Sequence, residues 1–270
     1  MAPALRQANR LTAAESRGAL YALLSYGWAY PTPEVLETMT TAAGWFGGAI
    51  FLSTVARETD GVVRGALDWI QTFGRTHHIG PQEIRDRYVA LFGHAVRGQC
   101  PPYELEYGRS EIIQQANELA DIAGFYSAFG LEPEHTAAER LDHVTIECEF
   151  LAVLCAKEAV GLQSDSSRLV ETAQGAQRAF LKDHLGRWLP SFCRRVVSAD
   201  GDGPYGPLAR LSASLIEAEC HCLDIAAGSP YLELRPADPE ADATIDCDGS
   251  REEDRLVPLT VNGAACAAAG

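Results

Sequence analysis

Apolar residues recur at steps of three and four along most of this chain, and this spacing constrains the fold more than any other feature. Leu20, Leu23, Leu24 and Trp28 show it near the N-terminus. Because a helical turn takes 3.6 residues, each such series places an apolar stripe on one face of a helix. No stretch shows sustained alternation of apolar and polar residues with β-branched enrichment, the pattern typical of strands. The sequence therefore predicts an all-α fold, a single-domain helical bundle.

Local sequence patterns predict where the helices begin and end. A capping box, Thr12-x-x-Glu15, predicts the start of a helix that Pro31 terminates. Pro81 suits the first turn of a helix that runs to Phe92. Ser110 is a suitable cap for a helix that ends near Gly130. Further apolar stripes predict helices from Leu141 through Cys155, from Ser167 to Leu185, from Pro190 to Val197, and from Pro207 to Ala227 with Gly228 closing it.

The composition changes after Gly228. From Ser229 onward, nine acidic residues stand against three arginines, and the apolar residues are too scattered to form a helix face. Such segments bury little apolar surface on folding. We therefore expect an all-α domain over residues 1–228 and an acidic, disordered or loosely docked tail over residues 229–270, in which Tyr231–Leu234 can pack locally.

Charge and hydropathy restrict the class of protein. The chain of 270 residues has a net charge of −15 and no cluster of Lys and Arg, which excludes a nucleic-acid-binding surface of the usual kind. Its longest apolar run, Phe150–Ala156, is far shorter than the roughly 20 residues of a membrane span. Glu15 and Arg17 stand where a signal peptide would need apolar residues. We expect a cytoplasmic protein without membrane insertion.

Two short patterns resemble ligand sites, but their spacing argues against both. Cys220-His221-Cys222 on a helix would point its two thiols ~200° apart, so one metal ion could not contact both. Gly201-x-Gly203-x-x-Gly206 matches a dinucleotide fingerprint, yet a helix and not a strand precedes it. All eight cysteines are expected to be free thiols in a reducing compartment.

No catalytic set is recognisable. The pairs His77-His78 and Asp142-His143, with His135, lack the helical spacing that puts two metal ligands on one face. No Gly-x-Ser-x-Gly elbow is present, and no cysteine sits in a motif that would lower its pKa. The residue patterns thus predict no catalytic residue, no metal and no cofactor.

Four blocks of residues occur in a recognisable order. The first is Tyr88-x-x-Leu91-Phe92. The others are Pro101-Pro102-Tyr103-Glu104 with Tyr107-Gly108, Asp142-His143 followed by Glu147-x-Glu149-Phe150, and Phe180-Leu181-x-x-His184-Leu185-x-x-Trp188-x-x-x-Phe192. Together they resemble the TorD/DmsD/NarJ-like family of redox-enzyme maturation chaperones. The loop is most similar to that of the chaperones that serve type II enzymes of the DMSO reductase group. The resemblance covers about Ala14 to Ala227.

The resemblance implies a cytoplasmic chaperone without catalysis of its own. Its partner would be the molybdenum-containing catalytic subunit of a type II DMSO-reductase-family enzyme. The chaperone would bind the twin-arginine signal peptide or the mature core of that subunit until the molybdenum cofactor is inserted, before export. The tail over residues 229–270 has no counterpart in the resemblance. The oligomeric state, monomer or homodimer, stays open.

The residue chemistry fits such a client, because an arginine-bearing peptide needs carboxylates beside an apolar groove. We expect the loop from Gly93 to Tyr103, which contains Pro101 and Pro102, to be exposed at the surface and only partly rigid. His143 could give pH dependence or orient Asp142. The predicted client-binding residues are Leu91, Phe92, Pro101, Pro102, Tyr103, Glu104, Tyr107, Asp142 and His143.

Two other functions stay open from the sequence alone. One is an all-α metal-dependent hydrolase, which would require a bound metal ion. The other is a generic helical oligomerisation scaffold, which would self-associate without selective peptide binding.

Overall fold

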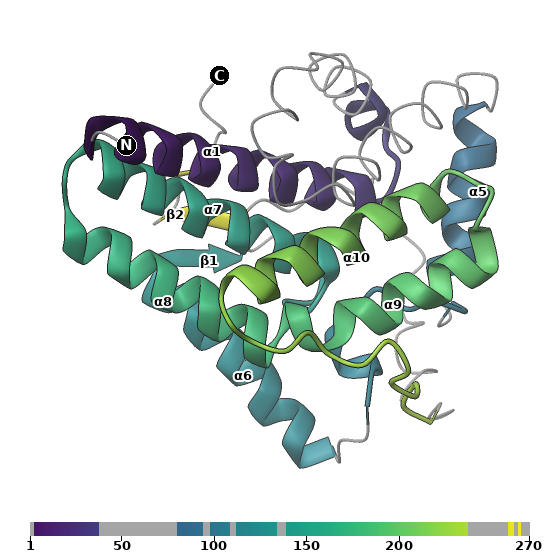
Figure 1. Cartoon of the computed structure of the whole chain (residues 1–270). Coiled ribbons are helices and arrows are strands. Elements are labelled where there is room, and N and C mark those ends of the chain that lie inside the picture. The colour runs from purple at the N-terminus through teal and green to yellow at the C-terminus, as the bar shows by residue number, and fades with distance from the viewer. Residues whose placement is uncertain are drawn as a thin grey trace.

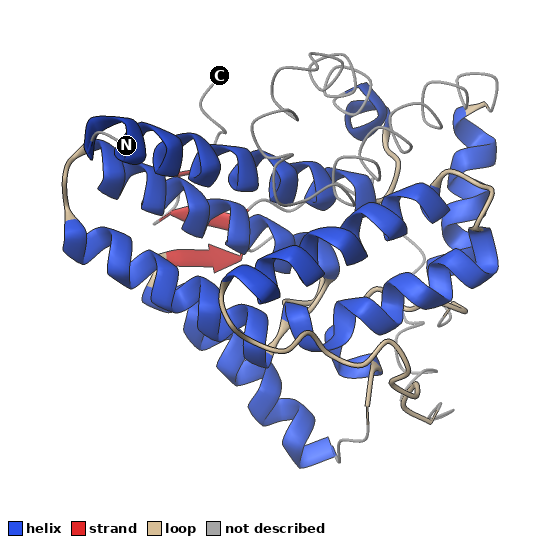
Figure 2. Cartoon of the chain, viewed as in Figure 1, coloured by secondary structure: helices blue, strands red, loops and turns tan. Residues whose placement is uncertain are grey.

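The structure is a computed structural model that describes residues 3–37, 80–93, 98–108, 112–133, 139–236, 259–261 and 264–265. Helices dominate these ranges (Figure 2), and the predicted all-α fold is confirmed. The elements are α1 (Pro3–Trp28), α5 (Pro81–Phe92), the 3₁₀ helix η2 (Glu104–Glu106), α6 (Ile112–Ala128), α7 (Val144–Gln163), α8 (Ser167–Asp183), α9 (Leu185–Asp200) and α10 (Tyr205–Cys222).

The helices pack in pairs around one core. Helix α1 lies along α7, α7 also packs against α8, and α10 packs along α9 (Figure 1). Large aromatic side chains fill the junction between α1, α5 and α9: the Trp28 ring lies 4.8 Å from that of Phe192 and 5.9 Å from that of Phe92. All three side chains are buried. The apolar stripes read from the sequence are therefore the faces that the helices turn inward.

Several helix boundaries differ from those predicted. Helix α1 begins at Pro3, and the Thr12 hydroxyl donates to the Ala8 carbonyl at 3.1 Å inside the helix. The predicted capping box is therefore wrong, because the preceding residues continue the helix. Helix α5 begins at Pro81 as predicted. Ser110, the predicted cap of α6, lies outside the described residues.

Helix α9 contains Pro190, which the sequence placed at a helix start. A proline has no N–H, so the carbonyl four residues earlier, that of Gly186, loses its helical donor. The Gly228 N–H donates to this carbonyl at 2.9 Å. Helix α10 ends at Cys222, earlier than predicted. The chain after it returns to α9, where Gly228 binds the Gly186 carbonyl.

A short antiparallel sheet accompanies the helices. Strand β1 (Leu131–Pro133) pairs with β2 (Leu259–Val261), and β2 pairs with β3 (Ala264–Ala265). The sequence analysis predicted no strands, because segments this short show no alternation. Within the tail, the structure describes only residues 229–236, 259–261 and 264–265. The predicted disorder of the rest, and the histidines at positions 77, 78 and 135, fall on residues that the structure does not describe.

One buried polar group joins four helices. Arg17 of α1 donates to Glu219 of α10 at 2.8 Å, to Glu158 of α7 at 3.1 Å, and to Gln177 of α8. Gln177 also donates to Glu158 at 3.0 Å. Burial would lower the pKa of Arg17, but the charge of Glu219 raises it well above its ordinary value. We refer to Arg17, Tyr21, Glu158, Gln174, Gln177 and Glu219 as the helix cluster.

The two motifs that the sequence analysis rejected lie in ordinary structural settings. Gly201 and Gly203 lie in the turn between α9 and α10, where Asp200 accepts a hydrogen bond from the Tyr205 amide at 3.0 Å. Cys220 is buried and Cys222 is exposed. The six cysteines that the structure describes are all free thiols.

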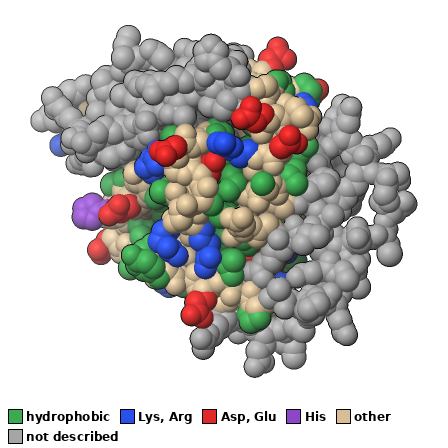
Figure 3. Space-filling view, turned by 90° about the vertical axis from the view of Figure 1, so that its right-hand side faces the viewer, with side chains coloured by type: hydrophobic (Ala, Val, Ile, Leu, Met, Phe, Trp, Pro, Cys, Tyr) green, Lys and Arg blue, Asp and Glu red, His purple; other side chains and the backbone are tan. Residues whose placement is uncertain are grey.

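The described surface is of mixed polarity. Figure 3 shows the end of the molecule where α5 lies, with acidic and basic side chains interspersed among small apolar areas. None of the helices in the described ranges has both the length and the apolar character that crossing a bilayer requires.

Candidate functional site

The Pro-rich loop, residues 98–108, is fixed by backbone hydrogen bonds to the segment that precedes α7. The Val144 amide donates to the Pro102 carbonyl and the Glu104 amide donates to the Asp142 carbonyl, both at 2.9 Å. Tyr103 and His143 form an antiparallel bridge between the two segments. Pro102 and Glu104 are buried, and Tyr103 is half-buried. Surface exposure was expected for Gly93–Tyr103 and is wrong for Cys100, Pro101 and Pro102, which are buried where the loop pairs with the start of α7.

His143 caps the start of α7. Its Nδ1 accepts a hydrogen bond from the Thr145 amide at 3.2 Å and lies 2.7 Å from the Thr145 hydroxyl. Burial lowers the pKa of His143 below its ordinary value, which favours the neutral ring. A neutral acceptor at an N-cap satisfies one of the free amides of the first helical turn. The local geometry thus gives His143 a structural role.

Asp142 is held by an arginine two residues earlier. Arg140 contacts both oxygens of the Asp142 carboxylate, with Nε at 3.0 Å and a terminal nitrogen at 2.8 Å, and the Leu105 amide donates to the same carboxylate at 3.1 Å. Burial raises the pKa of Asp142 above its ordinary value, while the Arg140 charge and the Leu105 amide oppose this shift. This bidentate geometry is the one that carboxylates use for guanidinium groups in general.

Glu104 lies fully buried between a histidine and an arginine. His184 Nδ1 lies 3.1 Å from one carboxylate oxygen, and Arg187 donates to the other at 2.6 Å. Burial alone would raise the pKa of Glu104, but the hydrogen bond and charge of His184, with those of Arg187, lower it below its ordinary value. For His184, burial would lower the pKa, but Glu104 and then Asp121 raise it above its ordinary value. These shifts therefore favour the ionised form of Glu104.

Glu147 is the second fully buried carboxyl group here, and it differs from Glu104. It accepts a hydrogen bond from the Trp188 indole at 3.0 Å. Burial, followed by the charge of Glu104, raises the pKa of Glu147 well above its ordinary value. The two environments thus shift the pKa values of these carboxyl groups in opposite directions.

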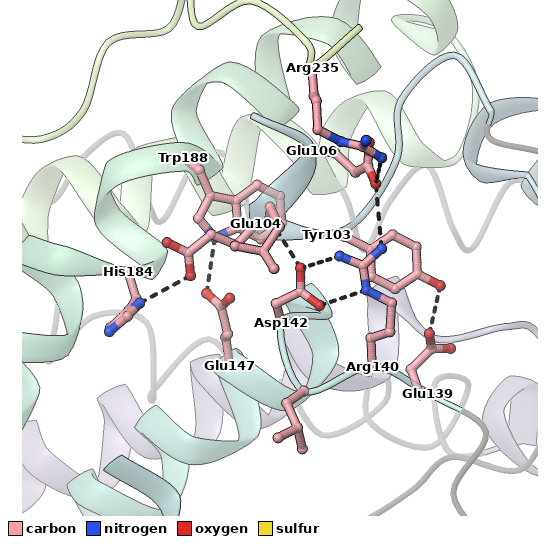
Figure 4. A network of polar contacts seen from close by, with 12 residues as sticks. Tyr103, Glu104, Glu106, Glu139, Arg140, Asp142, Glu147, His184, Trp188 and Arg235 are labelled. Carbon is pink, nitrogen blue, oxygen red and sulfur yellow. Dashed lines mark hydrogen bonds and ion pairs between the residues drawn. The ribbon is translucent and has the colours of Figure 1, made fainter. Parts of the chain in front are cut away.

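Tyr103 and Glu106 form the outer part of the same network (Figure 4). The Tyr103 hydroxyl donates to Glu139 at 2.6 Å, and the Arg140 guanidinium lies 4.6 Å from the centre of the Tyr103 ring. Arg140 also reaches Glu106 at 3.4 Å, and Arg235 of the tail reaches the same Glu106 oxygen at 3.4 Å. We refer to Tyr103, Glu104, Glu106, Glu139, Arg140, Asp142, Glu147, His184, Arg187 and Trp188 as the loop cluster.

The structure brings together only some of the predicted site residues. Tyr103, Glu104, Asp142 and His143 meet where the loop joins α7, and Tyr107 donates to the Pro101 carbonyl at 2.9 Å from beneath. Leu91 and Phe92, by contrast, are buried in the aromatic core, where the Phe92 ring packs against those of Trp28, Tyr88, Phe192 and Tyr205. Leu91 contacts the loop through its main chain, since the Cys100 amide donates to the Leu91 carbonyl at 2.8 Å. The client-binding role of the predicted residues stays a prediction.

The sequence analysis assigned no binding role to several members of the loop cluster. Arg140 lies directly before the Leu141-Asp142 pair, and its position two residues from a carboxylate was the available indication. Glu147, His184 and Trp188 stood inside the recognised blocks without a role. Arg187 and Arg235 could not be found, because their contacts with Glu104 and Glu106 join residues far apart in the chain.

Residues 57–194 match the family described as nitrate reductase delta subunit. This range is slightly more than half of the chain and contains the whole loop cluster. The chain belongs to this family. Its membership confirms the resemblance that the four sequence blocks indicated.

This chain has several curated relatives with functional names. It is 31% identical over 144 residues to a chaperone protein TorD of Vibrio cholerae serotype O1 (strain ATCC 39315 / El Tor Inaba N16961), covering 53% of this chain and 63% of that relative. It is 36% identical over 138 residues to the chlorate reductase assembly chaperone protein of Ideonella dechloratans, covering 48% and 66% of the two chains. It is 28% identical over 191 residues to the perchlorate reductase assembly chaperone protein of Dechloromonas aromatica (strain RCB), covering 67% and 78%. The chain thus spans less than two thirds of the length of the TorD relative.

Among the described residues, no group of three or more His, Cys, Asp and Glu side chains is arranged to hold a metal ion. The loop cluster instead combines carboxylates with guanidinium groups and a histidine. Its chemistry is therefore that of charge-assisted hydrogen bonds between carboxylates and guanidinium groups.

Proposed function

We propose that this protein is a cytoplasmic assembly chaperone for the molybdenum-containing catalytic subunit of a type II DMSO-reductase-family enzyme. In this proposal it binds an arginine-bearing segment of that subunit, from a twin-arginine signal peptide or from the mature core. It holds the subunit while the cofactor is inserted, before export, and catalyses no reaction itself.

One observation carries the proposal. The chain's relatives include proteins named as assembly chaperones of chlorate reductase and perchlorate reductase, and the family match contains the loop cluster. Related chains named for different reductases support a shared role in assembly. The choice of reductase for this chain does not follow from the comparison.

The loop cluster supplies the chemistry that such a client needs. Glu106 contacts Arg140 and Arg235 at 3.4 Å each, which is long for a charge-assisted hydrogen bond. Arg140 also holds the buried Asp142, so the Arg235 contact is the one that a client arginine can take over. A client arginine can therefore replace one of these contacts at Glu106 without leaving a buried carboxylate uncompensated.

Co-purification tests the proposal. The tagged protein is co-expressed with the catalytic subunit of each molybdenum reductase encoded in the same genome. We expect one of these subunits to co-purify in its cofactor-free form and to leave once it holds molybdenum. Co-expression with the chaperone should raise the molybdenum content of that subunit.

Two matched variants locate the contact. Glu106→Gln should weaken the complex about tenfold, because the amide cannot form a charged pair with a client arginine. Glu171→Gln removes an exposed carboxylate on α8 and should leave the complex unchanged. A complex that forms with none of the subunits would contradict the proposed function. An equal effect of the two variants would place the contact elsewhere.

A further inference from the structure

The first part of the tail crosses the outside of α9 as an extended segment. Figure 1 shows the chain after α10 running beside α9. We refer to residues Ser229–Pro236 as the strap. Arg194 of α9 donates to the Pro230 carbonyl at 2.7 Å, and Ser191 donates to the Leu232 carbonyl at 3.1 Å. Side chains of α9 therefore hold the strap by the strap's main-chain carbonyls.

At its far end, the strap pairs with the Pro-rich loop as an additional strand. Tyr107 and Leu234 form an antiparallel bridge. The Gly108 amide donates to the Glu233 carbonyl at 2.8 Å, and the Arg235 amide donates to the Glu106 carbonyl at 2.9 Å. These contacts also use the main chain, so they do not depend on which side chains the paired segment carries.

Two features of the strap's side chains define which segments fit this edge of the loop. Leu232 and Leu234 pack against the core while Tyr231 is 72% exposed, so every second side chain faces inward. Arg235 then turns its guanidinium to Glu106, within the loop cluster (Figure 4). A segment that fits this edge is therefore extended, carries two apolar residues two positions apart, and has an arginine directly after the second.

We propose that the loop edge Glu106–Gly108 is a docking surface for an extended, arginine-bearing client segment, and that the strap occupies it until such a segment arrives. The identity of the client rests on the function proposed above. The strap supplies the same main-chain pairing, apolar contacts and guanidinium that the client would supply. It thereby excludes segments that lack one of these features.

Because the strap is covalently attached, it determines how tightly a free segment must bind in order to displace it. A segment attached through residues 223–228 competes as though present at a concentration in the millimolar range. A free segment with identical contacts therefore binds weakly to the intact protein. Its apparent affinity rises in proportion to the fraction of molecules in which the strap has left. Loosening the strap should increase binding of a second copy of the same segment.

The probe is a fluorescent synthetic peptide with the sequence of residues Ser229–Pro236, added to the full-length protein. In the Leu232→Ser/Leu234→Ser variant, the peptide should bind at least about tenfold more tightly than to the unaltered protein. A peptide with glutamine in place of its arginine should bind roughly threefold to tenfold more weakly than the original peptide. The control is Val160→Ser, which replaces a 54% exposed apolar residue of α7 and should behave as the unaltered protein.

A second variant separates exchange from unfolding. Arg235→Gln leaves the strap leucines in place, and it should raise the affinity for the peptide several-fold while the thermal melt stays cooperative. Equal peptide binding by the unaltered protein, Arg235→Gln and Val160→Ser would overturn the proposal. The probe requires no reductase, so the two proposals fail separately. Peptide exchange without a reductase complex contradicts only the proposed function, and a reductase complex without peptide exchange contradicts only the docking role of the loop edge.

Discussion

The helix cluster and the loop cluster are both buried groups of charged side chains, but different parts of the fold hold them. In the helix cluster, Arg17, Glu158 and Glu219 belong to α1, α7 and α10, which pack along their lengths. In the loop cluster, Glu104 and Asp142 belong to η2 and to the segment before α7. The first set of positions is fixed by helix packing, whereas the second depends on loop pairing.

The cations of the two clusters also differ in exposure. The Arg17 side chain is 20% exposed and balances two buried carboxylates at once. The side chains of Arg140 and Arg187 are 42% and 34% exposed. Arg140 and Arg187 nevertheless hold the buried Asp142 and Glu104, so the contacts that can change at little cost are the long ones at Glu106. The helix cluster is therefore suited to stability, and exchange in the loop cluster is limited to Glu106.

Removing the cation of the helix cluster should have the largest effect. Arg17→Met leaves Glu158 and Glu219 buried without compensation, so the free energy of unfolding should fall by about 3–5 kcal/mol. Arg10→Met, on the exposed side of the same helix, should change it by less than about 0.5 kcal/mol. Urea denaturation measures both variants. Equal stability of the two would mean that the helix cluster contributes nothing to folding.

The two buried carboxyl groups of the loop cluster should differ in their contribution. Glu104→Gln removes the negative charge beside His184 and Arg187 and should lower the free energy of unfolding by about 2–3 kcal/mol. Glu147→Gln replaces a carboxyl group whose pKa is raised by an amide that still accepts from Trp188, and should change this free energy by less than about 1 kcal/mol. Denaturation at neutral pH compares them. The reverse order would show that Glu147 is the ionised group.

The stability of the loop cluster should depend on pH in a defined window. The pKa of His184 is raised on folding, so its contribution is complete below its ordinary value of 6.5 and is lost as pH rises through the folded value. The pKa of Glu104 is lowered, so its contribution is present above its ordinary value of 4.5 and is lost as pH falls through the folded value. The pair therefore stabilises the protein most between these two ordinary values.

A histidine substitution tests this window. The stability difference between the unaltered protein and His184→Gln should shrink as the pH rises from about 6 to about 9. His221→Gln, at an exposed position of α10, should show no such trend. Thermal melts across the pH range would show the difference. A constant difference for His184→Gln would mean that its pKa is not raised.

The smallest effect is expected at the rim of the loop cluster. Tyr103→Phe removes the hydroxyl that donates to Glu139 at 2.6 Å and should cost about 1 kcal/mol, because Tyr103 is only half-buried. Tyr231→Phe, at a 72% exposed position, is the control and should have no measurable effect. Denaturant titration distinguishes them. A cost above that of Glu104→Gln would place the energetic centre of the cluster at its rim.

Local patterns were enough to predict that helices form but not all of their ends; the apolar stripe of α8, for example, reflects short-range periodicity. The loop was misjudged, because Pro101 and Pro102 indicate a turn but not the long-range bonds that bury it. Pairing of β1 with residues 259–261 joins segments far apart in the chain, which no local pattern contains. The carboxylates of the site were recognisable as charged residues beside aromatic ones. Their arginine partners Arg187 and Arg235 became visible only when the fold brought distant segments together.

Hydrogen exchange measured on the complex with the cofactor-free reductase subunit tests the central claim most directly. The account predicts that client binding changes the protection of amides in Glu104–Gly108 and in the strap, because the client replaces the strap at the loop edge. Amides of α1 around Arg17 should keep their protection. A change confined to α1 and α7, with the loop edge and the strap unaffected, would contradict the assignment of the loop cluster as the client-binding site.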